Sequence, residues 1–111
     1  MDKNDYEFLA TVKLSINRAL WGEVIPSLRQ VSVNWNPENK TIQINFYHDG
    51  KITGAIDSHY SSIMAEVNAD YWGVNIKSDY ELIHSNYPNP LPNDEFVVYR
   101  RKEPFIDPID A

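Results

Sequence analysis

The stretch NRALWGEVIPSLRQVSVNW, residues 17–35, contains the point at which a helical pattern of apolar residues changes into the alternating pattern of a strand. Gly22 is placed to end the helix in a left-handed conformation, and Pro26 prevents a simple continuation. Val31 and Val33 then alternate with polar residues, as in a strand with one buried face. The stretch therefore predicts the helix-to-strand junction of a scaffold rather than a catalytic motif.

The segments on either side of this junction continue the same two patterns. Apolar residues recur at steps of three and four over residues 4–20, which predicts a helix with Asn4 as its N-cap. Turn residues at 36–39 join the first strand to a second alternating run at 42–47. The two strands are therefore expected to form a hairpin with one apolar and one polar face.

The second half of the chain predicts one more helix and two more strands. Asp57 or Ser58 can cap the second helix, and Gly73 is expected to end it. Alternation over residues 72–84 predicts a third strand, and the run EFVVYRR at 95–101 predicts a fourth.

This order of elements, α-β-β-α-β-β, predicts an α+β two-layer sandwich. Two helices are expected to pack on one face of a mainly antiparallel four-stranded sheet. Residues 1–103 form a single domain in this interpretation, and residues 104–111 form a mobile tail. The other face of the sheet is predicted to be polar, with these side chains on it: Asn34, Gln43, Asn45, Tyr47, Asn75, Lys77, Asp79 and Glu81.

The composition is that of a small folded protein. Of 111 residues, 42% are hydrophobic and 23% are charged, and none is cysteine, which excludes disulfides and thiolate zinc sites. The N-terminal MDKNDYEF lacks the charged and apolar regions of a signal peptide, and no apolar run is long enough to span a membrane. We therefore expect a cytoplasmic protein with no membrane partner.

The net charge of −6 arises in one segment. Residues 1–51 contain six acids and six bases, and residues 100–111 contain three of each. Residues 52–99 contain seven acids and one base, Lys77. Such a surface repels nucleic acid and favours a basic protein partner. The simpler alternative is that the acidity only keeps the protein soluble.

The sequence contains no assembled catalytic or metal-binding motif. Asp57 and His59 are a carboxylate–histidine pair at close spacing, but at a helix start they point in different directions, so helix capping by Asp57 is the better explanation. No nucleophile elbow, phosphate-binding loop or dinucleotide fingerprint is present. We therefore expect no enzymatic activity, no cofactor and no metal.

The stretches SINRALWGEVIPSLRQVSVNW, INFYHDG and IMAEVNADY, within residues 9–84, resemble small bacterial immunity proteins. These are cytoplasmic antidotes encoded beside secreted toxins, including those of contact-dependent growth inhibition systems. The resemblance implies that the chain binds one cognate toxin domain and blocks its active site. Many such toxins are nucleases, especially RNases, with basic substrate-binding surfaces, which an acidic segment would complement.

Charge and exposure, rather than the resemblance, select the candidate partner-binding residues. The acidic candidates are Asp57, Glu66, Asp70, Asp79 and Glu81, and the aromatic ones are Tyr47 and Trp72. Two other functions stay open: an adaptor or regulator that binds another basic cytoplasmic protein, and a small hydrolase that uses the acidic face. A toxin-like reading frame immediately upstream would favour the immunity protein over both.

Overall fold

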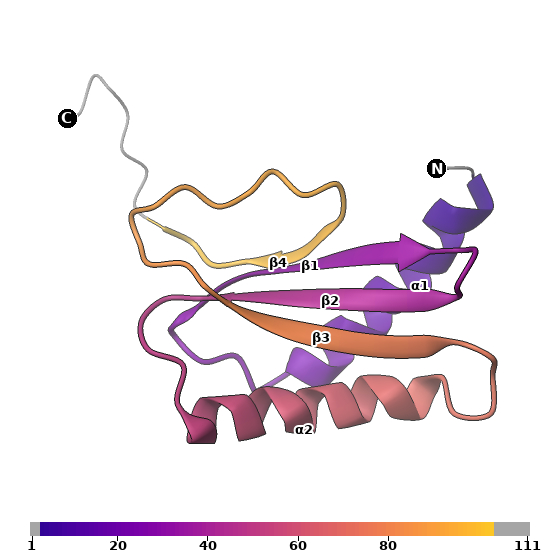
Figure 1. The fold of residues 1–111 in the computed structure, drawn as a ribbon, viewed down its shortest axis with the longest axis horizontal. Coiled ribbons are helices and arrows are strands. Elements are labelled where there is room, and N and C mark those ends of the chain that lie inside the picture. The colour runs from indigo at the N-terminus through magenta and orange to yellow at the C-terminus, as the bar shows by residue number, and fades with distance from the viewer. Residues whose placement is uncertain (1–2, 104–111) are drawn as a thin grey trace.

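Two helices cover one face of a four-stranded sheet in the computed structural model, which describes residues 3–103 (Figure 1). In chain order, the elements are α1 (Lys3–Leu20), β1 (Leu28–Asn36), β2 (Thr41–His48), α2 (Gly54–Asp70), β3 (Lys77–His84) and β4 (Val97–Arg100). The α+β class, with two helices and four strands, is therefore confirmed.

Local features of the sequence mark the end of α1 and the start of α2. Because α1 begins at Lys3, Asn4 lies inside the helix, and the prediction that it is the N-cap was wrong. Gly22 has φ 77°, the left-handed conformation that follows α1. The cap of α2 is Thr53, whose side-chain oxygen accepts a hydrogen bond from the N–H of Ile56 at 3.3 Å. The prediction that Asp57 or Ser58 caps this helix was wrong, because the helix begins earlier, at Gly54.

The strand order is β3-β2-β1-β4, and the sheet is mixed. β1 pairs with β2 and with β4 in the antiparallel sense, whereas β2 and β3 are parallel, with Thr41 opposite Lys77 and His48 opposite His84. The sheet was predicted to be mainly antiparallel; two of its three strand pairs are antiparallel, and the parallel pair of β2 and β3 is the exception. Helix α2 carries the chain back to the end of the sheet where β2 begins, and parallel strands need such a crossover.

The third and fourth strands are shorter than their alternating patterns predicted. β3 begins at Lys77 instead of Trp72, because Gly73 adopts φ 82° and the N–H of Val74 donates to the carbonyl of Tyr71 in a turn. β4 covers only Val97–Arg100.

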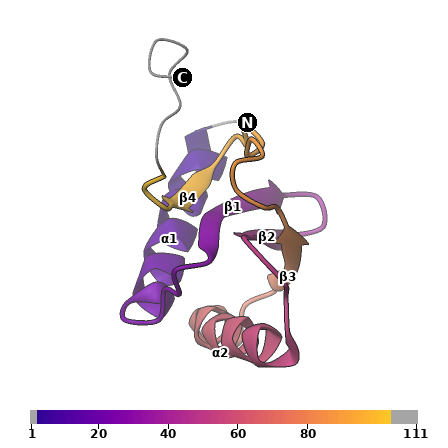
Figure 2. The ribbon, with the colours of Figure 1, turned by 90° about the vertical axis from the view of Figure 1, so that its left-hand side faces the viewer.

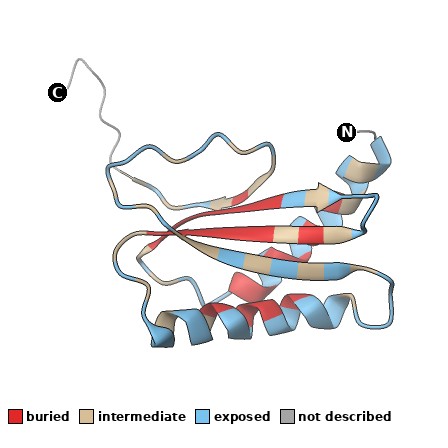
Figure 3. Ribbon diagram, in the orientation of Figure 1, coloured by how far each residue is buried: buried red, intermediate tan, exposed pale blue. Residues whose placement is uncertain are grey.

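The core lies between the helices and the sheet. Buried side chains of β1 and β2 pack against the inner stripes of α1 and α2, and the ring of Phe46 stacks on that of Tyr60 at 4.8 Å between centroids. Figure 3 shows this burial in red along β1, β2 and the inner helix faces, while β3 has no buried residue. The edge strand β3 is therefore the most accessible of the long strands.

The loop over residues 85–96 lies on the other side of the sheet from the helices (Figure 2). Asp94 accepts hydrogen bonds from the hydroxyls of Ser32 at 2.6 Å and Tyr47 at 2.9 Å. The loop covers the end of the face that carries Gln30, Ser32 and Tyr47. This face was predicted to be polar, but its Tyr47 end is closed, not solvated.

A buried ion pair joins β1 to the chain that follows β4. The guanidinium of Arg29 is 2% exposed and donates to Glu103 at 2.7 and 2.8 Å and to the Ser85 hydroxyl at 3.1 Å. Arg101 donates to Asp49 and to the same Glu103. The predicted tail at 104–111 lies outside the described residues.

Candidate protein-binding surface

The seven predicted partner-binding residues lie on different parts of the molecule. Three of the acids are on α2, and the other two are on the polar side of β3. Trp72 follows the end of α2, whereas Tyr47 is in the interior. The seven residues therefore do not form one patch, and the structure separates those with internal partners from those without.

Two of the α2 acids have partners within the fold. Asp70 accepts hydrogen bonds from the buried hydroxyl of Ser15 at 2.5 Å and from Arg18 at 2.8 Å, which joins α2 to α1. The Ser15 hydrogen bond, followed by the charge of Arg18, holds the pKa of Asp70 below its usual value. Asp57 accepts a hydrogen bond from the hydroxyl of Tyr80 at 3.2 Å. Both carboxylates contribute to tertiary structure whatever else they contact.

The other three acidic candidates differ from Asp57 and Asp70 in having no hydrogen-bonding or ion-pair partner among the described residues. Glu66, Asp79 and Glu81 are exposed and form no hydrogen bond or ion pair with any residue in the range 3–103. Asp94 and Glu95, which complete the acidic segment, accept hydrogen bonds from other side chains. Glu66, Asp79 and Glu81 are thus the acids whose charge is most available to a partner.

Asp79 and Glu81 belong to rows of polar side chains that cross the sheet. Gln43 lies opposite Asn34 on one side and Asp79 on the other, and Asn45 lies opposite Glu81. We call these residues the polar face: Asn34, Asn36, Thr41, Gln43, Asn45, Lys77, Asp79 and Glu81. Strict alternation puts them on the side of the sheet away from the helices.

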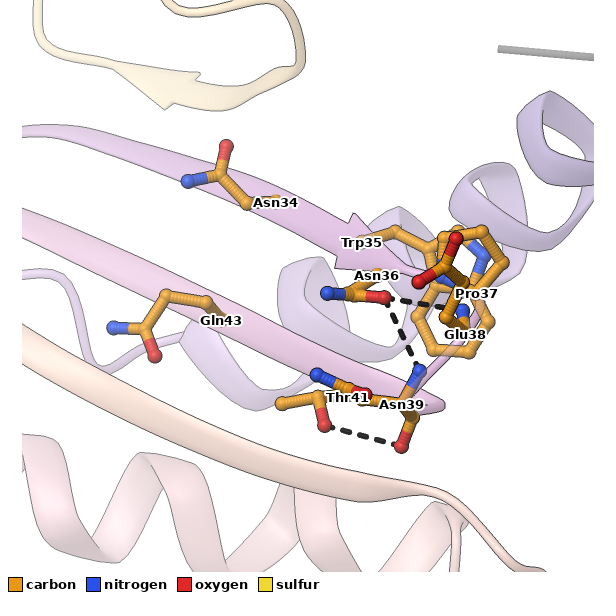
Figure 4. A pocket seen from close by; sticks show the side chains of 8 residues that line it. All are labelled: Asn34, Trp35, Asn36, Pro37, Glu38, Asn39, Thr41 and Gln43. Carbon is orange, nitrogen blue, oxygen red and sulfur yellow. Dashed lines mark hydrogen bonds between the residues drawn. The ribbon is translucent and has the colours of Figure 1, made fainter.

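A hollow of about 640 Å³ opens at the hairpin end of the polar face (Figure 4). Its lining includes Asn34, Asn36, Glu38, Thr41 and Gln43. The Asn36 side-chain oxygen accepts hydrogen bonds from the N–H groups of Glu38 and Asn39 at 3.0 and 3.1 Å, which fixes the turn. The hollow therefore offers amide and hydroxyl groups and one ionisable side chain, Glu38.

The two aromatic candidates differ in exposure. Trp72 is 90% exposed, and a hollow of about 330 Å³ lies between it and the first residues of β3. Tyr47 is 7% exposed, and burial together with the hydrogen bond to Asp94 raises the pKa of its hydroxyl. Of these two candidates, Trp72 is therefore the one whose aromatic surface is available to a partner in this conformation.

The histidines and carboxylates that the structure describes do not assemble into a metal site. Among residues 3–103, no three His, Asp or Glu side chains are close enough together to bind a metal ion. The Nε2 of His59 instead forms a hydrogen bond with the backbone carbonyl oxygen of Glu23 at 2.6 Å. His48 is buried, and its Nδ1 lies within hydrogen-bond distance of the Tyr60 hydroxyl.

Sequence reasoning missed two features of these surfaces. The amide rows of Asn34, Gln43 and Asn45 were placed on the correct face but not among the binding candidates, although their alternation was visible. Val74, 53% exposed beside Trp72, was assigned to a strand, although Gly73, which was expected to end the helix, was the local signal for the turn that exposes it.

A protein-family model described as MafI2 immunity protein matches residues 10–103. No curated protein matches the chain. Within the part of the chain that the structure describes, no helix has both the length and the apolar character needed to cross a membrane.

Proposed function

Because the chain belongs to the MafI2 immunity protein family, we propose that it is a non-catalytic cytoplasmic protein that binds and neutralises one cognate toxin domain, a basic RNase. The family match over residues 10–103 carries the proposal, and it agrees with the resemblance noted in the sequence. In this proposal the protein covers the cleft in which the toxin would bind RNA.

The distribution of charge supports a basic partner. Residues 52–99 contain the whole net charge of −6, and three of their carboxylates have no partner within the described fold. A cleft that binds phosphate is lined by Lys and Arg, so these carboxylates would attract the toxin and accelerate its encounter with the antidote. Rapid association matters for an antidote because free toxin acts until it is bound.

The test uses the toxin domain encoded beside the immunity gene. The variant Glu66→Gln/Asp79→Asn/Glu81→Gln changes the net charge from −6 to −3 without removing an internal contact. The control, Glu7→Gln/Glu23→Gln/Glu38→Gln, makes the same change in the N-terminal half. We expect the first variant alone to associate about tenfold more slowly at low salt.

Three outcomes would contradict parts of the proposal. Equal association rates for both variants would make the acidic segment a solubility feature. A toxin domain that degrades no RNA would contradict the nuclease assignment. A wild-type protein that neither binds this domain nor protects cells expressing it would contradict neutralisation itself.

A further inference from the structure

β3 pairs on one side only within residues 3–103. The N–H of Lys77 donates to the carbonyl of Lys40, and the N–H of Ser85 donates to that of His48, both at 2.9 Å. In a parallel ladder, alternate residues direct both backbone groups to the same neighbouring strand. The odd-numbered residues therefore face β2, and Ser78, Tyr80 and Leu82 direct their N–H and C=O groups away from the sheet.

The other edge of the sheet is shorter and less regular than β3. β4 has four residues and an irregular register against β1. β3 has eight residues, no proline and a continuous register against β2 from Lys77 to His84. Short and bulged edges resist strand addition, whereas long regular ones accept it. β3 is thus the edge suited to a further strand.

The surroundings of this edge indicate the chemistry of such a strand. Asp79 and Glu81 lie on the polar face of β3 without internal partners. At the Lys77 end, the hollow beside Trp72 provides room for a large side chain. A neighbouring strand with cations at alternate positions would place them beside the two carboxylates, and opposite charges on adjacent strands stabilise pairing.

We propose that β3 accepts an extended segment of the toxin, with Lys or Arg at alternate positions, as a fifth strand of the sheet. This inference rests on the proposed function, because the toxin is the partner. Backbone hydrogen bonds at Ser78, Tyr80 and Leu82 hold the segment, and Asp79 and Glu81 select its charge. A second copy of the chain is the poorer occupant, since it would bring another net charge of −6 to the same edge.

The experiment measures amide hydrogen exchange along β3 by NMR, on the wild-type protein alone and with a saturating amount of the toxin domain encoded beside it. We expect exchange at Ser78, Tyr80 and Leu82 to slow by about tenfold or more. The amides of Asp79, Glu81 and Ile83 already face β2 and are the internal controls, so their exchange should change much less.

Each result has one meaning. Alternating protection in the complex supports the inference. A complex that forms and protects cells, but leaves Ser78, Tyr80 and Leu82 exchanging as in the free protein, overturns it and leaves the proposed function intact. Protection of these amides in the free protein that increases with its concentration identifies a second copy as the occupant. Absence of any complex refutes the proposed function and this inference together.

Discussion

Arg29 in β1 and Glu103, just after β4, form a bidentate ion pair: Nε donates to Oε2 at 2.7 Å and Nη2 donates to Oε1 at 2.8 Å. The hydrogen bond from Arg29 is the main reason that the pKa of Glu103 lies below its usual value. Because the guanidinium is almost fully buried, its charge depends mainly on this carboxylate, and the Ser85 oxygens and the charge of Asp49 add to its stabilisation.

Replacing Glu103 is expected to destabilise the fold. Glu103→Gln should lower the free energy of unfolding by about 3 kcal/mol, because it leaves a buried guanidinium without its counter-charge. Urea denaturation measures the loss. The control is Glu7→Gln, which removes an exposed i,i+4 contact to Lys3 at 3.9 Å and should cost almost nothing. Equal losses of unfolding free energy in the two variants would show that the buried Arg29–Glu103 pair stabilises the fold no more than an exposed ion pair does.

The buried His48 should make stability depend on pH. Burial lowers its pKa from 6.5, so the unfolded chain binds a proton that the folded one excludes. The contribution of neutral His48 to the free energy of unfolding is therefore complete above about pH 6.5. It is lost as the pH falls through the pKa of His48 in the folded protein. We expect the free energy of unfolding of the wild type to fall as the pH drops below about 6.5, and this slope to flatten in His48→Gln. An unchanged slope in the variant would assign the effect to other groups.

The hydroxyl of Tyr47 should help to hold the loop over residues 85–96 on the sheet. Tyr47→Phe removes one of two hydrogen bonds to Asp94 and should lower the free energy of unfolding by about 1 kcal/mol. Tyr6→Phe is the matched control, since its 3.4 Å bond to Glu95 is exposed. Thermal unfolding measures both variants, and a Tyr47→Phe protein as stable as wild type would mean that packing alone holds the loop.

Trp72 and Trp21 provide a comparison between two exposed tryptophans, 90% and 85% exposed. Neither alanine variant should change stability by more than about 0.5 kcal/mol. Trp72→Ala should weaken toxin binding by about 30-fold, because an aromatic beside the β3 edge would be buried by the added strand. Trp21→Ala, at the end of α1, should bind as wild type does. Equal affinities in calorimetry would exclude Trp72 from the interface.

Sequence reasoning succeeded at the junction of α1 and β1, where spacing within one element determines local structure. The helical stripe ending at Gly22 and the alternation of Val31 and Val33 each follow from spacing within one element. The parallel pairing of β2 with β3 could not be derived in this way, because it depends on where α2 returns the chain. The burial of Tyr47 was missed for a similar reason, since the residue that covers it, Asp94, is 47 positions away.

The candidate surface was predictable in charge but not in geometry. Composition identified the acidic segment, and Asp79 and Glu81 were correctly placed on the face of the sheet away from the helices. Sequence could not indicate that Asp70 is engaged by Ser15 and Arg18, because that contact joins two helices across the core side of the fold.

The alternation of core and polar residues along β2 has a consequence for how relatives with other specificities can arise or be engineered. Ile42, Ile44 and Phe46 are fully buried, while Gln43, between them, belongs to the polar face. Exchange of whole segments between relatives would carry folding and recognition determinants together and would mismatch the core. Point substitutions at Thr41 and Gln43, the two residues of β2 that are not buried, would instead change the polar face without altering the core. New specificities on this scaffold should therefore arise through single substitutions on the polar face rather than through recombination of whole segments.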